Sequence, residues 1–199
     1  MNYNKVTEEI IENLNKKPSI LIHSCCGPCS SYVLEYLSKY FNITIYYYNP
    51  NIDSEEEYTK RLNEQVKIIN LLSKKSDIKL IEGKYEPQKY YEYIKGLENE
   101  KEGNRRCIKC YNLRLEQTAL VAKELNFDYF CTTLTISPHK DAKIINFLGK
   151  RLENKYDVSY LYSDFKKKNG YKRSIELSKE YDLYRQDYCG CIFSKKEYD

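Results

Sequence analysis

Five short apolar runs alternate with longer amphipathic stretches along the chain, and this alternation constrains the fold more than any other feature. Each run has the length and the apolar content of a buried strand. Strands that alternate with helices predict βαβ units and a mostly parallel, doubly wound α/β sheet. The predicted strands are Ser19–His23, 42–48, 77–81, 127–134 and 158–162, and the predicted helices are 30–40, 54–72, 90–97, 104–125, 139–152 and 174–181.

The 199 residues contain no internal repeat, low-complexity stretch or linker, so we expect a single α/β domain over residues 1–199. The C-terminal segment of about 163–199 is basic, since residues 163–196 hold nine Lys/Arg and five Asp/Glu. We expect this segment to complete the functional site. A basic surface suits a polyanion such as RNA, whereas a solvated helix face accounts for the same charges without a partner.

The composition is that of an ordinary soluble protein, with 41% hydrophobic and 31% charged residues. No apolar run approaches the roughly 20 residues that cross a bilayer, and residues 1–17 lack the apolar centre of a signal peptide. We therefore expect a cytoplasmic protein whose cysteines stay reduced. In that setting, clustered cysteines indicate metal binding or catalysis rather than a disulfide scaffold.

Seven of the eight cysteines fall into three tight clusters, and only Cys131 stands apart, inside a predicted strand. Functional loops of parallel sheets gather at the carboxyl ends of the strands, and the first cluster directly follows the first strand. The sequence therefore predicts a cysteine-rich metal site at that edge. We expect Cys131 to be a small core residue. The clusters are Cys25-Cys26-Gly27-Pro28-Cys29, Cys107-Ile108-Lys109-Cys110 and Cys189-Gly190-Cys191.

Cys26 and Cys29 alone have the spacing of a thioredoxin-type redox pair at a strand-to-helix turn. Simple thiol exchange does not need the adjacent Cys25, however, and leaves the other clusters unexplained. Cys107 and Cys110 share a helix face, so with the first two cysteines they supply four thiolates, enough for a tetrahedral zinc or an iron–sulfur cluster. Adjacent ligands favour the larger cluster, and structural zinc is the alternative.

The surroundings of the second and third clusters suit redox chemistry. We expect Arg105, Arg106 and Lys109 to offset the negative charge of a thiolate-bound cluster. Cys189 and Cys191 are separated by one glycine, and a disulfide between them closes a small strained ring, which suits a redox switch. Two free thiols, or two further metal ligands, are the alternative.

Four other residues are candidates on weaker grounds. His23 ends the first strand and is either a metal ligand or a hydrogen-bonded core histidine. Asp164 follows the last strand, where a carboxylate can bind iron, move a proton or cap a helix. Arg185 and Gln186 either contact a ribose or phosphate or lie on the surface. The turn after the first strand holds cysteines instead of a glycine-rich loop, so nucleotide hydrolysis is not expected.

A set of motifs runs in order along nearly the whole chain, from about residue 19 to residue 194. The motifs are His23-Ser24-Cys25-Cys26-Gly27-Pro28-Cys29, Tyr48-Asn49-Pro50-Asn51-Ile52, Arg106-Cys107-Ile108-Lys109-Cys110-Tyr111, residues 114–119, Thr132-Thr133-Leu134-Thr135-Ile136-Ser137-Pro138, Asp164-Phe165-Lys166-Lys167 and Tyr184-Arg185-Gln186-Asp187-Tyr188-Cys189-Gly190-Cys191-Ile192-Phe193-Ser194. This set resembles the QueH family, the cobalamin-independent epoxyqueuosine reductases. It is far more specific than a single C-x-x-C.

The resemblance implies a HUP (adenine nucleotide alpha hydrolase-like) fold and the last step of queuosine synthesis, in which epoxyqueuosine at the tRNA wobble position loses its epoxide oxygen. It also implies a redox-active disulfide between Cys189 and Cys191. The implied ligands of a [4Fe–4S] cluster are Cys25, Cys26, Cys107 and Cys110. The candidate ligands of an additional iron ion beside the cluster are Cys29, Asp164, Cys189 and Cys191.

The same resemblance implies two partners, a tRNA that binds through its anticodon arm and an unidentified protein that supplies electrons. We expect a monomer and no membrane partner. Two alternatives stay open. One is an ATP-dependent tRNA-thiolating enzyme on a related scaffold, against which the missing glycine-rich loop argues. The other is a non-catalytic zinc-binding RNA module.

Overall fold

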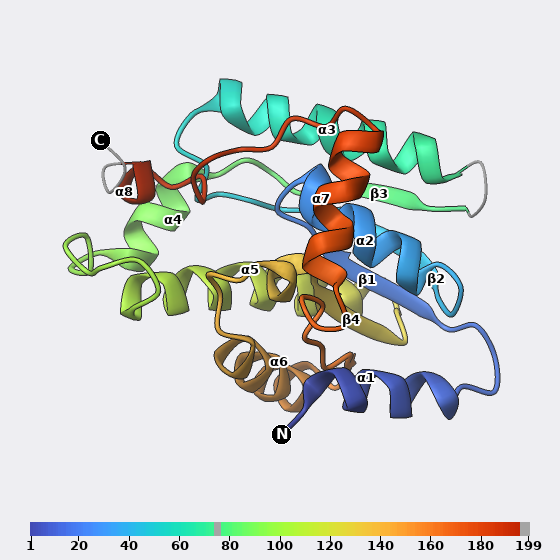
Figure 1. The fold of residues 1–199 in the computed structure, drawn as a ribbon. Coiled ribbons are helices and arrows are strands. Elements are labelled where there is room, and N and C mark those ends of the chain that lie inside the picture. The colour runs from blue at the N-terminus through green and yellow to red at the C-terminus, as the bar shows by residue number, and fades with distance from the viewer. Residues whose placement is uncertain (74–76, 196–199) are drawn as a thin grey trace.

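A computed structural model describes residues 1–73 and 77–195, and in that part of the chain five strands form one parallel sheet (Figure 1). The strands are β1 (Ser19–His23), β2 (Asn42–Tyr47), β3 (Lys79–Glu82), β4 (Tyr129–Thr132) and β5 (Ser159–Tyr160). Their order in the sheet is β3-β2-β1-β4-β5, so the chain starts in the middle and builds outward in both directions. This is the predicted doubly wound α/β topology, and it is consistent with a HUP-like fold.

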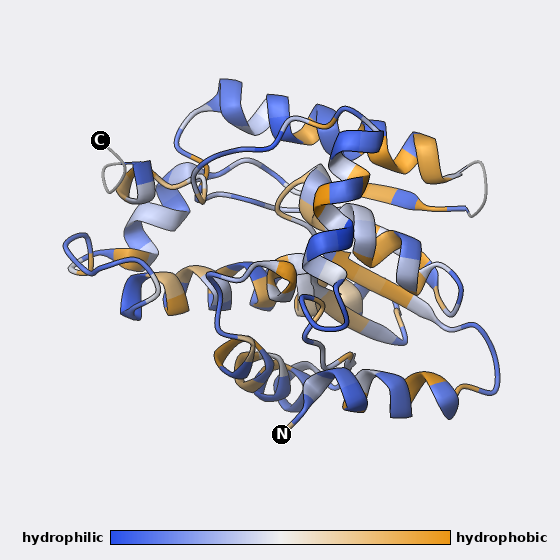
Figure 2. Cartoon of the chain, in the orientation of Figure 1, coloured by the Kyte–Doolittle hydropathy of each residue, from blue (hydrophilic) through white to orange (hydrophobic). Residues whose placement is uncertain are grey.

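Helices connect the strands and cover the sheet, as parallel strands require. They are α1 (Tyr3–Glu12), α2 (Gly27–Leu37), α3 (Glu55–Ser73), α4 (Pro87–Ile94), α5 (Arg105–Glu124), α6 (Ala142–Tyr156), α7 (Gly170–Glu180) and α8 (Ile192–Lys195), with a 3-10 turn, η1, at Thr133–Ile136. α2 packs on α3 and α7, whereas α5 packs against β1, β4 and α6. Figure 2 shows the apolar residues along β1 and the polar ones on the outer turns of the helices.

β1 lies at the centre of the sheet, between β2 and β4. Ile20, Leu21 and Ile22 are completely buried, because both faces of a central parallel strand are covered. At the carboxyl end of β1, His23 lies opposite Thr132 of β4. The strand order reverses between these two strands, and open α/β sheets bind their ligands at that edge.

The turn after β1 leads directly into α2, which begins at Gly27 and has Pro28 in its first turn. Proline suits this position because the first N–H groups of a helix have no partner inside the helix. A Cβ on Gly27 would lie 2.6 Å from the backbone oxygen of Glu64 in α3, so only glycine lets the two helices approach this closely. The helix starts three residues earlier than predicted, which places Cys29 in its first turn.

Among the other boundaries that differ from the prediction, two shape the carboxyl edge of the sheet. The strand predicted at 127–134 ends at Thr132, whose hydroxyl accepts the N–H of Leu134 and starts η1. The next helix begins three residues later than predicted, at Ala142, because the Asp141 side chain caps it. As a result, the residues between η1 and α6 form a loop at the carboxyl edge of the sheet.

α1 and α8 were not predicted. The one buried side chain that α1 has is polar: the hydroxyl of Thr7 donates to the carbonyl of Tyr162, 2.7 Å away. The ring of Tyr3 stacks on that of Tyr162. The last part of the predicted basic segment, residues 196–199, lies outside the described residues. No helix in the described part of the chain is long and apolar enough to span a membrane.

Candidate active site

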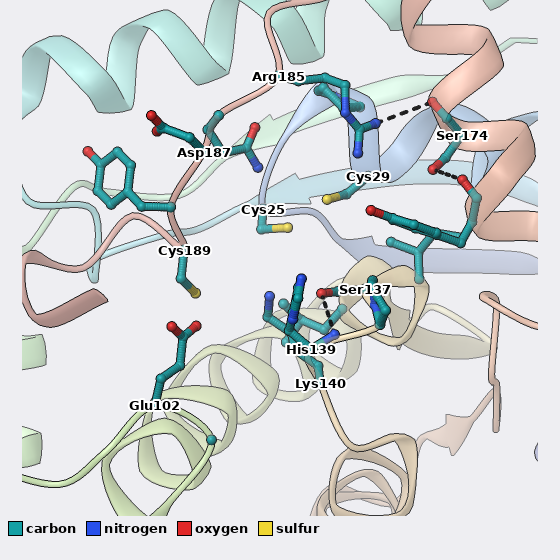
Figure 3. A pocket seen from close by; sticks show the side chains of 18 of the residues that line it. Cys25, Cys29, Glu102, Ser137, His139, Lys140, Ser174, Arg185, Asp187 and Cys189 are labelled. Carbon is teal, nitrogen blue, oxygen red and sulfur yellow. Dashed lines mark hydrogen bonds between the residues drawn. The ribbon is translucent and has the colours of Figure 1, made fainter. Parts of the chain in front are cut away.

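A cavity of about 390 Å³ opens at the carboxyl edge of β1 and β4 (Figure 3). Its wall comes from the turn into α2, the loop before α5, Arg114 of α5, η1 with the loop that follows it, and the C-terminal part of the chain from α7 onward. Cys25, Cys29 and Cys189 all line it, so the cavity joins two of the three cysteine clusters. Other lining side chains are those of Glu102, Arg114, His139, Lys140, Arg185 and Gln186.

The sulfur atoms of Cys25, Cys26 and Cys29 all lie within 4.8 Å of one another, and no other group of three His, Cys, Asp or Glu residues in the described chain is as compact. The sulfurs of Cys25 and Cys26 are 3.8 Å apart. Hydrogen bonds from Cys26 and Cys29 hold the pKa of the Cys25 thiol well below its usual value, whereas burial raises the pKa of Cys26 to about 12. The neighbouring thiols and burial also raise the pKa of Cys29, so the structure favours a single thiolate, on Cys25, that is stabilised by the other two thiols.

Two cations, Arg114 and Lys140, face these sulfurs. Arg114 of α5 is 1% exposed; its Nε donates to the carbonyl of Cys110 at 3.3 Å, and its Nη2 has no partner among the described residues. Lys140 is half-buried; burial acts to lower its pKa, but the Coulombic effect of the nearby sulfurs raises that pKa above its usual value. Buried charges are costly unless they are paired, so the site is prepared for concentrated negative charge.

The cations beside the second cysteine pair have other contacts. Arg105 is exposed and pairs with Glu100, and the ammonium group of Lys109 lies 5.2 Å from the ring centre of Tyr93. Arg106 is buried and donates to backbone carbonyls of the loop before α5. The Nε and Nη2 of Arg106 are buried and have no hydrogen-bond partner among the described residues, so Arg106 keeps its predicted charge-balancing role beside Arg114 and Lys140.

Cys107 and Cys110 lie one turn apart at the start of α5 and are almost completely buried. The N–H of Gly103 donates to the sulfur of Cys107 at 3.2 Å, a contact that also tunes metal-bound thiolates. Cys110 packs with Cys191 and Tyr90 in a small buried cluster. Burial raises the pKa of Cys110 to about 12, so it needs a metal or a cation nearby to become a thiolate.

All eight cysteines are free thiols in this structure. Cys189 faces the cavity, whereas Cys191 is 5% exposed and its thiol donates to the hydroxyl of Ser194 at 3.6 Å. Gly190, between them, has a φ of +110°. Cys189 thus lines the cavity, whereas Cys191 belongs to the buried cluster around Cys110, and no disulfide joins them in this structure.

Arg61 of α3 holds the segment that carries Cys189. It is 2% exposed, and its Nε pairs with Glu57 at 2.7 Å. Its Nη1 and Nη2 donate to the carbonyls of Cys189 and Tyr188, at 3.3 and 3.4 Å. The carbonyl of Gly190 accepts a backbone N–H from the loop before α3. These bonds position the Cys189 sulfur on the cavity wall.

Gln186 belongs to the sulfur site, since its Nε2 donates to the sulfur of Cys26 at 3.0 Å. Its Oε1 is buried and has no partner among the described residues. Arg185 instead donates to the hydroxyl of Ser178 at 3.1 Å and reaches the carbonyl of Ser174, so α7 holds it at the cavity wall (Figure 3).

Asp164 is not among the residues that line the cavity. Its carboxylate pairs with Lys166 at 2.6 Å, and it caps no neighbouring helix, because α7 begins after Asn169. The structure therefore does not bring Asp164 into contact with the cysteine sulfurs.

His23 is a completely buried, neutral core residue. Its Nδ1 lies 2.9 Å from the hydroxyl of Thr132, and its Nε2 lies 3.2 Å from the carbonyl of Tyr48. Because a carbonyl can only accept, Nε2 carries the proton and Nδ1 accepts. Burial, assisted by the charge of Arg114, lowers the pKa of His23 to about 3. Of the two roles considered for His23, the structure supports the core histidine.

The comparison with known proteins decides the family. The family model described as epoxyqueuosine reductase QueH matches residues 20–197. The chain belongs to the QueH family. Proteins named epoxyqueuosine reductase QueH from Staphylococcus epidermidis and Streptococcus pyogenes are 46% and 44% identical to it over 98% of this chain, which is 84% and 79% of their own lengths. The protein of that name from Thermotoga maritima is 36% identical over 90% of this chain and 91% of its own.

Membership of the QueH family makes the chain an oxidoreductase, as the resemblance implied. Arg114 was not singled out from the sequence, although its spacing carries a signal: it lies seven residues after Cys107 and four after Cys110, on the same face of the helix. Arg61 gave no such signal, because its partner Cys189 is distant in the sequence and only the fold brings them together.

Proposed function

We propose that the protein reduces the epoxide of epoxyqueuosine at the wobble position of a tRNA, and so forms queuosine in the last step of its synthesis. The match to the QueH family over residues 20–197 carries this proposal, and a cavity lined by three cysteines supports it. Removal of the epoxide oxygen as water consumes two electrons and two protons and leaves an alkene. Grouped thiols can supply electrons, and the two cations can supply or stabilise charge, so such a site suits a reaction that consumes electrons and protons.

The cofactor in this proposal is a [4Fe–4S] cluster. Its ligands would be Cys25, Cys26, Cys107 and Cys110. The surroundings fit such a group, because N–H donors of Gly103 and Gln186 reach two of these sulfurs and the Nη2 of Arg114 lacks a partner among the described residues. Proteins tune iron–sulfur clusters by hydrogen bonds to sulfur and by nearby charge. When bound, the cluster supplies single electrons.

Cys189 and Cys191 would act as a two-electron store. Oxidation of the two thiols to a disulfide releases two electrons and two protons, which balances the conversion of the epoxide to an alkene and water. Cys189 already faces the cavity, and Gly190 gives the segment the conformational freedom to bring Cys191 round. A separate electron-donor protein would then reduce the disulfide again.

Cys29 is the remaining thiol of the first cluster, and we assign it to an additional iron ion. Its sulfur lines the cavity, whereas Cys26 and Cys110 are buried behind the wall. Such an ion supplies Lewis acidity toward the epoxide oxygen. Cys189 is the second candidate ligand on the cavity wall. Asp164 could bind this ion only if its carboxylate left Lys166. Cys191 could bind it only if its thiol left the buried cluster around Cys110.

Lys140 would donate the proton to the departing oxygen. Its side chain lines the cavity, and its raised pKa means that it carries a proton at neutral pH. Opening of the epoxide C–O bond develops an alkoxide, which is basic enough to take a proton from an ammonium group. A hydrogen bond from the Lys140 ammonium group to the epoxide oxygen would also orient the epoxide before its C–O bond breaks.

The deciding assay gives tRNA that contains epoxyqueuosine, with a strong one-electron donor, to protein purified without oxygen. Digestion and mass spectrometry should show the loss of one oxygen from the modified nucleoside. Cys107→Ala and Cys189→Ala should abolish this loss. Cys131→Ala is the control, because it removes a completely buried thiol in β4 that does not line the cavity. Full activity of Cys189→Ala would remove the dithiol from the mechanism and leave the cluster.

Metal analysis and cofactor dependence separate the reductase from the two alternatives. Bound zinc, with no iron and no visible absorbance of an iron–sulfur cluster, would favour a non-catalytic zinc-binding RNA module. ATP-dependent transfer of sulfur to tRNA would favour a thiolating enzyme. The cysteines after β1, where a nucleotide-binding sheet carries its glycine-rich loop, argue against the second.

A further inference from the structure

The outer face of α6 presents an exposed aromatic ring between exposed cations. Phe147 is 60% exposed, more than any other large hydrophobic residue in the described chain except Met1. Lys143, Lys150 and Arg151 are also exposed. They lie four residues before, three after and four after Phe147, so all four side chains share one face of the helix.

The cations of this face are not neutralised by the protein itself. Within residues 1–73 and 77–195, no ion pair joins Lys143, Lys150 or Arg151 to a carboxylate. The basic C-terminal segment differs in this respect, because several of its cations form ion pairs with carboxylates. Its paired cations are Lys166, Lys168, Arg173 and Lys195.

The α6 face starts at the rim of the cavity. Lys140 lines the cavity, Asp141 caps the helix and Ala142 is its first residue. At 1.5 Å per residue, Phe147 lies about 8 Å along the axis from this start, and Arg151 lies about 14 Å from it. Figure 1 shows α6 outside α5, at the edge of the molecule. A polymer with one unit in the cavity can therefore follow the helix outward.

We propose that the outer face of α6 binds the anticodon arm of the substrate tRNA, with Phe147 stacked on an unpaired base of the loop and the three cations on backbone phosphates. The choice of tRNA rests on the proposed function, but the chemistry of the face is independent of it. One ring among cations, without an apolar surround, matches a nucleic acid better than the apolar core of a protein interface. Bases in a stem are paired and covered, so the ring contacts the loop.

Two variants test the face by RNA binding alone. The affinity of the full chain, purified without oxygen, for an unmodified tRNA transcript is measured by fluorescence anisotropy at several salt concentrations. Phe147→Ala should weaken binding about five- to 140-fold, the range of base–aromatic stacking. The double variant Lys150→Glu, Arg151→Glu should weaken binding and reduce the slope of log affinity against log salt by about 1.5, because two phosphate contacts are lost.

Matched controls come from the rest of the surface. Leu125→Ala removes a side chain that is 54% exposed at the end of α5 and should leave the affinity unchanged. Lys172→Glu, Lys179→Glu makes the same charge change on α7. Weaker binding by the α7 pair, with normal binding by the α6 pair, would overturn the proposal in favour of the C-terminal segment. Failure of the unaltered chain to bind tRNA would overturn it as well.

Catalysis then separates this inference from the proposed function. The α6 variants should raise the KM for epoxyqueuosine in tRNA while keeping normal turnover of the free nucleoside. An equal loss on both substrates would show that the face is not an RNA surface. If the unaltered protein reduces neither substrate, the proposed function fails, and the binding comparison still decides the role of α6.

Discussion

Replacement of Gly190 by alanine should dislodge the segment that presents Cys189 to the cavity while the rest of the fold stays intact. Gly190 has a φ of +110°, a conformation that L residues rarely adopt. A Cβ there would lie 2.9 Å from the Nη1 of Arg61 and 3.3 Å from Ile52. Arg61 cannot move aside easily, because it is buried and held by Glu57.

The cost follows from these two effects. The left-handed backbone costs an L residue about 1–2 kcal/mol. Displacement of the Arg61 guanidinium breaks its bond to the carbonyl of Cys189, and a hydrogen bond to a charged group is worth about 1.5–3 kcal/mol. The present arrangement of the segment should therefore lose roughly 2.5–5 kcal/mol. Since 1.4 kcal/mol is a factor of ten, local opening should become at least about 60-fold more frequent.

The labelling rate of Cys191 measures this opening, because Cys191 is 5% exposed and reacts with a thiol reagent only when the segment opens. In Gly190→Ala, mass spectrometry should show labelling about 60-fold faster or more, together with loss of reductase activity. Gly96→Ala is the matched control, with a φ of +83° and nothing within 4 Å of its added Cβ. Unchanged labelling of Cys191 with full activity in Gly190→Ala would refute the reasoning.

Three other substitutions test the packing and the charge of the site. Gly149→Ala should lower the free energy of urea unfolding by about 1–3 kcal/mol, because its Cβ would lie 2.3 Å from the ring of Tyr160. Asn146→Ala should lower it by about 2–4 kcal/mol, because two buried backbone groups after β5 lose their partner; a loss under about 0.5 kcal/mol would contradict this. Arg114→Met should weaken iron retention against a chelator about 10- to 100-fold, whereas Lys109→Met should retain iron normally.

The sheet could be predicted from the sequence because its strands are short apolar runs between helices. β1 has the predicted bounds, and the parallel direction of the strands follows from the alternation of strands and helices. α1 could not be predicted, since its one buried side chain is the hydroxyl-bearing Thr7, bonded to the distant Tyr162. The early end of β4 depends on one side-chain hydrogen bond of Thr132, and the hydropathy pattern of the sequence cannot predict such a bond.

The site was predictable in its cysteines and less so in its surroundings. Spacing identified the three clusters, but it left Cys29 unplaced, because the early start of α2 decides that its sulfur joins those of Cys25 and Cys26. The packing of Cys110 against Cys191 depends on a tertiary contact between α5 and the C-terminal segment, which no local pattern contains. The assignment of four cysteines to a cluster and two to a switch therefore stays a prediction.

Arg114 links the chemistry of the cavity to the stability of the fold. A guanidinium that is 1% exposed, with one nitrogen unpartnered in the described chain, has a high desolvation cost, and negative charge on the nearby sulfurs offsets part of it. A metal-bound thiolate site carries that charge permanently, so loading with iron should raise the free energy of unfolding. Arg114→Met removes the desolvation cost together with the attraction. The variant should therefore be less stable than the unaltered protein when both are loaded, and about equally stable when a chelator has removed the metal. Equal destabilisation in both states would mean that Arg114 acts through packing alone.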